Sequence, residues 1–434
     1  MHHAATAIFD IACDESLQLI KDLEALNLLD DDDDIELLHL LMQEAAVRRK
    51  EKFVRCRMDF TSFADKLDSE SGEQFYSMFR MKRKSFEKLV RFLKPYLPVD
   101  ESQSKRCTSG EAPIDAHIKI FCLIRYLAGG APQDIRVIAG ISLTSFYTSI
   151  KKALKAVLKC PELQIRLPHT HEELEVIRDG FADASMHEVM RGCVGALDGY
   201  LALVNTPCQK EVGNVKDYFS GHYHHMGINC QGMCDHHSRF TYFVVVAPGK
   251  THDSVAYMKA PGLREFIESL DTGRFFVVGD AAYIVTNKLL TPFKGSQREN
   301  RDRDAFNFFL SQLRIKIEQA FGMMVEKWRI LKRPFTRNIG VAANIIMACA
   351  RLHNFCINER LQYDHVVNGQ LDQTDLCHVF THEGRPHGYV VSDITHASGG
   401  DSTVREWILT SRVRAHALTR PPWNIIRNAN TFTA

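Results

Sequence analysis

The chain has 434 residues, of which 45% are hydrophobic and 25% charged, and its formal net charge is +1. This size allows two or three domains with packed cores. The sequence has no uninterrupted run of about 18 apolar residues and no basic and then apolar signal pattern at its start, so membrane insertion and secretion are not expected. The twelve cysteines are scattered over strand-like and helix-like segments, which is typical of reduced thiols in an intracellular protein.

The small net charge hides a segregation of charges along the chain. Residues 1–44 contain twelve Asp and Glu against the single Lys21, which leaves a net +12 for the remaining chain. Two later stretches are basic, with nine basic against three acidic residues over 80–106 and ten against five over 298–337. One such stretch alone is typical of a solvated surface. Two of them, on a chain whose acids gather in one tail, favour a polyanionic partner such as nucleic acid.

The first 60 residues are predicted to form an acidic arm followed by a helix. Residues 1–36 have weak apolar periodicity and end in five consecutive acids, whose mutual repulsion favours a mobile arm. From Ile35 to about Arg57, apolar residues recur at helical spacing and a basic segment follows, so a helix is expected there.

Residues 61–190 are predicted to form an all-helical domain. Apolar periodicity, with proline and glycine at the ends, predicts helices over 73–97, 114–127, 132–139 and 142–158. A turn at Gly140 separates the last two, which is the pattern of a helix-turn-helix unit. In such a unit the second helix enters a DNA groove. The side chains that it would present there are those of Thr144, Ser145, Tyr147, Lys151 and Lys152. Plain packing of three helices is the alternative, since helical pairs with a glycine turn are common.

Residues 191–360 have a strand-rich pattern that predicts an α/β domain. Short apolar or alternating runs bounded by turn residues predict strands over 193–199, 225–235, 239–247 and 274–280, with a helical segment over 252–270. In the long helix that follows, apolar residues from Leu313 to Leu331 fall on one stripe, and another apolar helix over 341–356 is expected to pack behind it. This order of elements predicts an RNase H-like fold, a mixed sheet flanked by helices.

Residues 361–434 are predicted to be a C-terminal extension with a short helix. Their composition is polar and glycine-rich up to Gly400. Thr403 and Glu406 then have the spacing of a capping box, which predicts a final helix through Leu418.

Three carboxylates stand where such a fold would bring them together. Asp198 and Asp280 each follow an apolar strand-like run, and Glu318 lies at the margin of the stripe on the long helix. The intervals of 82 and 38 residues between them leave room for the rest of the sheet and for the first turns of that helix. Hard divalent cations prefer oxygen ligands, and displacement at phosphorus needs charge neutralised on the attacking and the leaving oxygen. The three acids therefore predict a two-metal site for phosphodiester cleavage.

Six blocks of sequence surround these acids between about Gly192 and Glu359. They read GALDGY, DYFSGHYHHMGINCQGMCDHHSRF, PGKTHDS, GDAAYI, RIKIEQAFGMMVEKWRIL and ACARLHNFCI. In type and order they resemble PIF/Harbinger-type DDE transposases, a family that includes domesticated nuclease-like relatives. An upstream helical block resembles the family's N-terminal half, where it aligns with a helix-turn-helix-like region. The chain departs from the usual pattern after the first acid, where Tyr-Leu replaces a common Thr-His, and after the second, where Ala-Ala replaces a frequent Ser-Gly.

The resemblance implies a nuclear, metal-dependent DNA transposase or endonuclease that cleaves and joins phosphodiester bonds at transposon ends. By position it makes Asp198, Asp280 and Glu318 the catalytic residues and the metal ligands. Asp198 would bridge two Mg²⁺ or Mn²⁺ ions, and the other two acids would each hold one. The expected partners are double-stranded DNA, a separate Myb/SANT-like DNA-binding protein and further copies of the chain. A domesticated nuclease-like protein and a non-catalytic DNA-binding scaffold are the alternatives, although none of the acids is missing.

Other polar residues near the acids have less specific patterns. Asp253 opens a helical segment, and it is predicted to cap that helix, to support a metal ligand, or to bind metal itself. Five basic residues accompany the acid-bearing helix and are candidates for positioning phosphate groups: Lys316, Lys327, Arg329, Lys332 and Arg333. Three histidines before a strand either touch phosphate or are simply exposed: His222, His224 and His225.

Overall fold

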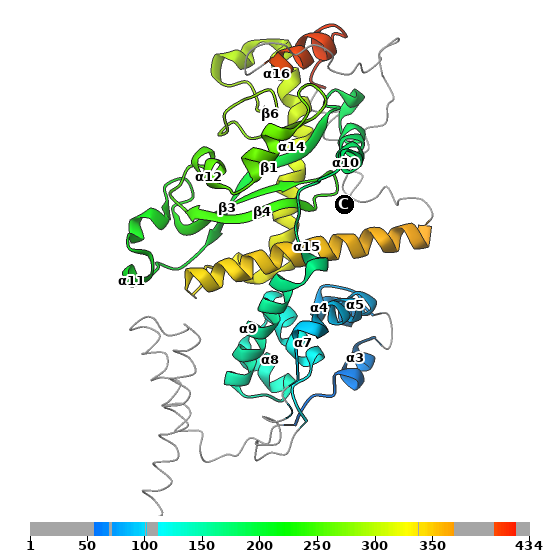
Figure 1. Ribbon diagram of the computed structural model, residues 1–434, viewed down its shortest axis with the longest axis vertical. Coiled ribbons are helices and arrows are strands. Elements are labelled where there is room, and N and C mark those ends of the chain that lie inside the picture. The colour runs from blue at the N-terminus through cyan, green and yellow to red at the C-terminus, as the bar shows by residue number, and fades with distance from the viewer. Residues whose placement is uncertain are drawn as a thin grey trace, which may run out of the picture.

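The computed structural model describes residues 56–68, 72–99, 101, 112–336, 338–368 and 403–421. Within these residues the chain forms a helical part, a mixed sheet with helices on both faces, and a C-terminal helical element near one end of the sheet (Figure 1). The predicted acidic arm over 1–36 and almost all of the predicted helix over 35–57 lie outside the described residues.

The described residues before the first strand form helices joined by turns. These helices are α3 (Phe60–Asp68), α4 (Glu73–Phe79), α5 (Arg83–Leu93), α7 (Ala116–Leu127), α8 (Pro132–Ala139), α9 (Leu143–Lys159) and α10 (His171–Asp183). The predicted helical segments are found, and the first contains two helices, α4 and α5, separated at Arg80, whose φ is 60°. Stacked and edge-to-face phenylalanines from α3, α4, α5 and α7 form the core of this part. Sequence patterns did not predict α3 or α10.

The turn between α8 and α9 requires glycine. Gly140 has φ 64°, and a Cβ atom there would lie 1.9 Å from the carbonyl oxygen of Cys56. A larger residue would therefore displace the segment that packs on the turn. The Ser142 hydroxyl then accepts a hydrogen bond from the backbone N–H of Ser145 and begins α9.

The sheet has the strand order β4-β3-β1-β5-β6, and the short β2 pairs with the start of β3. Pairing is antiparallel among β4, β3 and β1 and parallel among β1, β5 and β6. The strands are β1 (Cys193–Leu203), β2 (Phe219–Ser220), β3 (His225–Cys234), β4 (Phe240–Pro248), β5 (Phe276–Gly279) and β6 (Leu289–Leu290). All four predicted strands are present, and this mixed sheet flanked by helices is consistent with an RNase H-like domain.

Alternation along β1 assigns the covering helices to the two faces of the sheet. Successive side chains on a strand point to opposite faces. On the face of Tyr200 lies α14 (Arg301–Lys327), whose Phe321 ring stacks on Tyr200 at a centroid distance of 5.3 Å. On the face of Gly199 lies α12 (Asp253–Lys259), because the Asp253 carboxylate approaches the position that a Gly199 Cβ would occupy. The helix α13 (Leu263–Ser269) follows α12.

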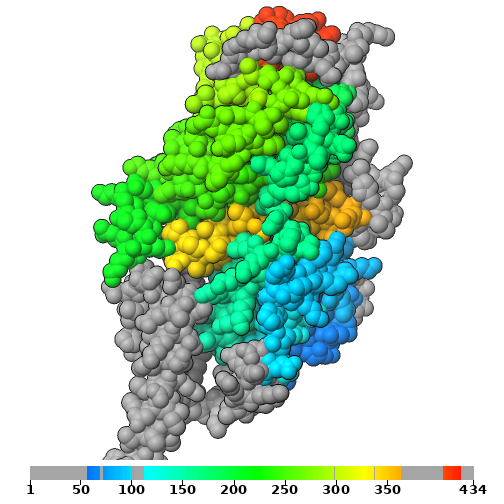
Figure 2. Space-filling view, in the orientation of Figure 1, coloured from blue at the N-terminus to red at the C-terminus, as the bar shows by residue number. Residues whose placement is uncertain are grey.

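The long helix α15 (Ile339–Asn368) runs between the helical part and the sheet. It contacts α9 on one side and β4 and α14 on the other, and it appears as a yellow and orange band across the middle of the molecule (Figure 2). By length and hydropathy alone, its segment Ile339–Gln362 could cross a membrane, but half of the apolar window is buried inside the protein. Burial between the two parts accounts for its apolar side chains.

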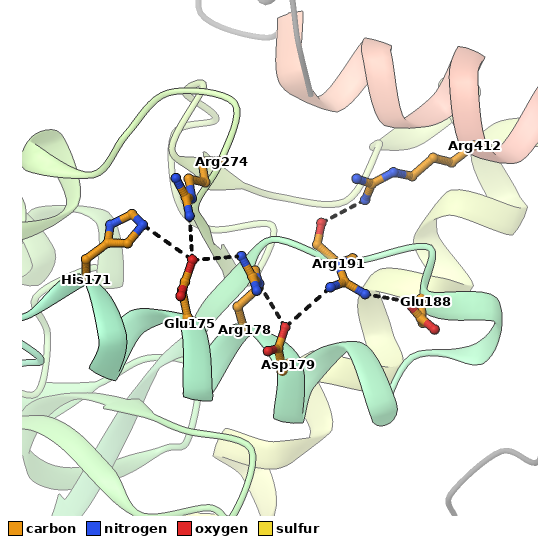
Figure 3. A network of polar contacts seen from close by, with 8 residues as sticks. All are labelled: His171, Glu175, Arg178, Asp179, Glu188, Arg191, Arg274 and Arg412. Carbon is orange, nitrogen blue, oxygen red and sulfur yellow. Dashed lines mark hydrogen bonds and ion pairs between the residues drawn. The ribbon is translucent and has the colours of Figure 1, made fainter. Parts of the chain in front are cut away.

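Ion pairs on α10 connect the segments that lead into two central strands (Figure 3). Glu175 of α10 pairs with Arg274, which precedes β5. Asp179 pairs with Arg191, which precedes β1, at 3.6 Å. Exposed pairs of this kind contribute little stability each.

The C-terminal element packs on α14 and on the entry to β1. It consists of α16 (Thr403–Ile408) and a π-helical turn, η8 (Leu409–Arg414). Its Arg412 side chain is buried and donates hydrogen bonds from Nη1 to the carbonyl oxygens of Val189 and Arg191, at 2.8 and 2.7 Å. The predicted final helix is therefore present but ends before Leu418, where the chain turns.

Candidate functional site

Strand register brings the first two acids together. Asp198 lies inside β1, and Asp280 follows directly after β5. In the parallel pairing of these strands, Leu197 is the partner of Gly279. The next residue on each strand is one of the two acids, so Asp198 and Asp280 lie side by side where β5 ends.

The third acid reaches the same place from α14. Glu318 and Arg314 lie one helical turn apart on α14 and form an ion pair at 2.5 Å. The same nitrogen of Arg314, Nη1, lies 3.8 Å from Asp198 Oδ2 and 4.0 Å from Asp280 Oδ1. The three predicted carboxylates therefore meet around one guanidinium nitrogen, on the face of the sheet that α14 covers.

The first acid is the most shielded of the three. The side chain of Asp198 is 21% exposed, against 43% for Asp280 and 46% for Glu318. Burial raises the pKa of Asp198 to about 6. A hydrogen bond from the Gly199 N–H and the charge of Arg314 lower this pKa, whereas the charges of Asp280 and Asp253 raise it. Burial dominates, so ionised Asp198 is held at a cost in the absence of a metal ion.

This raised pKa predicts a pH-dependent stability. Because the folded-state pKa of Asp198 lies above its usual value of 3.8, the folded protein loses stability as the pH rises through about 6. Each pKa unit corresponds to about 1.4 kcal/mol, and we expect Asp198→Asn to increase the free energy of unfolding at pH 8 by about 1–2 kcal/mol. Urea unfolding of both proteins in EDTA at pH 5 and pH 8 measures this. If the free energy of unfolding changes equally between pH 5 and pH 8 in both proteins, the raised pKa of Asp198 is contradicted.

Asp253 does not cap its helix. The N-cap of α12 is His252, and Asp253 is the first helical residue. The Asp253 carboxylate instead accepts hydrogen bonds from Asn229 Nδ2 at 2.8 Å and from Gln231 Nε2 at 3.3 Å. The predicted capping role is therefore wrong, because two buried amides of β3 hold this carboxylate against the sheet.

The sheet also separates Asp253 from the other acids. A Cβ atom on Gly199 would lie 2.3 Å from Asp253 Oδ1, so Asp253 faces the side of β1 to which position 199 points. Asp198 points to the opposite side. This placement disfavours a metal ion shared by the two residues. Asp253, Asn229 and Gln231 form a hydrogen-bonded group on this face of the sheet, and a supporting role for Asp253 stays a prediction.

Two features of this site were not predicted from the sequence. Arg314 stands one turn before Glu318, and that spacing alone could have identified it as a counter-ion. The amides of Asn229 and Gln231 alternate within an otherwise apolar strand, and such alternation is a signal for polar groups that face one buried site. The hydroxyl of Tyr283 extends this network by donating to Gln231 Oε1 at 2.8 Å.

The donor set fits a hard divalent cation. Asp198, Asp280 and Glu318 offer carboxylate oxygens only, which suits Mg²⁺ or Mn²⁺. The guanidinium group of Arg314 shows that a cation is accommodated among them. In the described part of the chain, no three His, Cys, Asp or Glu side chains stand in a geometry that already holds a metal ion.

The basic residues predicted to position phosphate lie in different surroundings. Lys316 is only 4% exposed, so the prediction that it contacts DNA is not supported, because its side chain lies in the interior. Lys327 donates to the carbonyl oxygen of Arg80, and Lys332 pairs with Glu326. The remaining two are exposed on the surface after α14: Arg329 and Arg333.

The candidate DNA-contacting residues of α9 do not form one exposed surface. Tyr147 and Lys151 line a cleft between α9 and α15. The Ser145 hydroxyl accepts a hydrogen bond from that of Ser142, and Thr144 is half-buried. Lys152 is exposed. The use of α8 and α9 as a helix-turn-helix stays a prediction.

An exposed aromatic side chain stands in the turn between β2 and β3. Tyr223 is 54% exposed and stands between His222 and His224. Partial burial raises its pKa, and the charges of Asp253, Asp198 and Asp280 raise it further. The neighbouring His225 is exposed at the start of β3.

Comparison with known proteins identifies the segment that contains the site. Residues 197–354 match the family model described as DDE superfamily endonuclease. This segment starts one residue before Asp198, contains Asp280 and Glu318, and ends within α15. Searches of curated proteins and of solved structures gave no match. The family match supports a DDE-type transposase or nuclease function for this segment, with DNA as its substrate.

Proposed function

We propose that this protein is a PIF/Harbinger-type DDE transposase that cleaves and joins DNA at transposon ends with two divalent cations. The observation that carries the proposal is the meeting of Asp198, Asp280 and Glu318 around a single cationic nitrogen, where β5 ends beside β1. The match of residues 197–354 to a DDE endonuclease family supports the same chemistry.

Each acid has a separate task in this proposal. Asp198 sits on the central strand β1 and would contact both ions, whereas Asp280 and Glu318 would each hold one. When bound, such ions lower the pKa of a water molecule or a 3′-hydroxyl and neutralise charge on the leaving oxygen. The attack would then be in line at phosphorus and would need no covalent protein intermediate.

The proposed substrate and partners follow from this class of reaction. Double-stranded DNA would approach the face where the acids meet, and exposed basic residues such as Arg329 and Arg333 would bind its phosphates without reading sequence. Further copies of the chain and a Myb/SANT-like DNA-binding protein are proposed to bring two ends together. The nucleus is the proposed location, because the substrate is chromosomal DNA.

A cleavage assay tests the proposal. Purified protein is incubated with a plasmid that carries the DNA flanking the coding locus, in Mg²⁺, in Mn²⁺ and in EDTA. We expect nicking or cleavage in both metals and none in EDTA, and a loss of at least about a thousandfold in Asp198→Ala. Binding of DNA by wild type and variant without cleavage in either metal would instead favour a non-catalytic scaffold.

A further inference from the structure

Arg314 stands at the point where the metal ions of the proposed reaction would bind. One nitrogen of its guanidinium group lies within 4.0 Å of an oxygen of each of the three acids. An ordinary ion pair between residues four apart on a helix joins one cation to one acid. Here the same nitrogen is shared with two further acids that come from the sheet.

The charges of this cluster explain why a cation is needed there. Three carboxylates that converge repel one another, and the low exposure of Asp198 weakens solvent screening. The Arg314 side chain is itself only 26% exposed. A guanidinium group keeps its proton at every accessible pH and has several donors in a fixed plane. Arg314 therefore supplies a permanent positive charge that can face several carboxylates at once.

We propose that Arg314 is an internal counter-ion of the acid cluster, which holds the three carboxylates together without metal and competes with divalent cations for them. This inference rests on the proposed function, because it assumes that the acids bind metal. Arg314 acts through the acids, so it is a positioning residue. A carboxylate oxygen that faces the guanidinium group is less available to a metal ion, and metal binding must displace Arg314 from the cluster.

Metal affinity separates this proposal from a merely structural role. Removal of a competing cation tightens metal binding, whereas loss of a structural support weakens it. We expect Arg314→Gln to bind Mn²⁺ about tenfold more tightly than wild type. Arg314→Lys should lie between them, because a compact ammonium group faces fewer carboxylates at once. Arg301→Gln is the matched control, since it removes the same charge from the exposed first residue of α14, and it should bind Mn²⁺ like wild type.

The measurement is calorimetric titration of the full chain with Mn²⁺, together with thermal unfolding in EDTA and in Mn²⁺. We expect Arg314→Gln to unfold at a lower temperature than wild type in EDTA and to gain more from Mn²⁺, since the ion replaces the lost cation. If Arg314→Gln does not fold in EDTA, the comparison of Arg314→Lys with wild type decides.

Each outcome has one meaning. Equal Mn²⁺ affinities in wild type and Arg314 variants, or weaker binding by the variants, overturn the counter-ion proposal and leave the proposed function standing. Absence of Mn²⁺ binding in every protein overturns both. The order Gln, then Lys, then wild type in decreasing affinity supports the proposal.

Discussion

Replacement of Asp280 by Asn, or of Glu318 by Gln, is expected to reduce metal-dependent DNA cleavage by at least about a thousandfold while DNA binding in EDTA stays within about twofold. Both substitutions keep the shape of the side chain and remove the negative charge that a metal ligand needs. The two residues would act as a unit, since each holds an ion of the same reaction. The double variant should therefore cleave no more slowly than the slower single variant, which a gel assay of single-turnover cleavage measures.

Glu326→Gln is the matched control for this experiment. Glu326 lies further along α14, is 66% exposed and pairs with Lys332, so its loss should leave cleavage near the wild-type rate. Similar rates for Glu318→Gln and Glu326→Gln would remove Glu318 from the site. If the fold-loss of cleavage rate in the double variant equals the product of the two single fold-losses, the two acids act in separate steps.

The largest effect on stability is expected at Arg412. Its buried guanidinium group satisfies the carbonyl oxygens of Val189 and Arg191 and lies 5.2 Å from the centre of the Trp407 ring. Arg412→Met keeps the length of the side chain but leaves both carbonyl oxygens without this donor. We expect a loss of about 3–4 kcal/mol in the free energy of unfolding, because hydrogen bonds to charged groups contribute about 1.5–3 kcal/mol each. Denaturant unfolding measures it.

Arg414→Met gives the control for the Arg412 experiment. Arg414 lies two residues further along, is 54% exposed and pairs with Asp302. An exposed pair contributes about 1 kcal/mol at most, so the Arg414 variant should be nearly as stable as wild type. If the Arg412 variant loses as little free energy of unfolding as the Arg414 variant, the C-terminal element is held by its apolar contacts and not by Arg412. Because Val189 and Arg191 lead into β1, the Arg412 variant should also slow cleavage.

Local patterns predicted the elements well wherever local interactions decide them. Helices α7, α8 and α9 begin and end within two residues of the predicted bounds, because capping residues, proline and Gly140 mark their ends. The two-residue strands β2 and β6 were not predicted, since such short segments have no periodicity of their own. For Lys316, only the placement of α14 on the sheet showed that a lysine beside the stripe is buried.

For the site, too, some features were predicted from the sequence and others depended on tertiary packing. The positions of Asp198, Asp280 and Glu318 after strand-like runs and on a helix, together with the resemblance of the surrounding blocks to a known family, predicted that the three acids meet. Which cation they meet, and which acid is kept apart from them, depended on long-range packing. Arg314 reaches all three acids because α14 crosses one face of the sheet, and Asp253 is held on the other face by Asn229 and Gln231. A face of a sheet is a property of strand pairing, and residues distant in sequence must be in place before it exists.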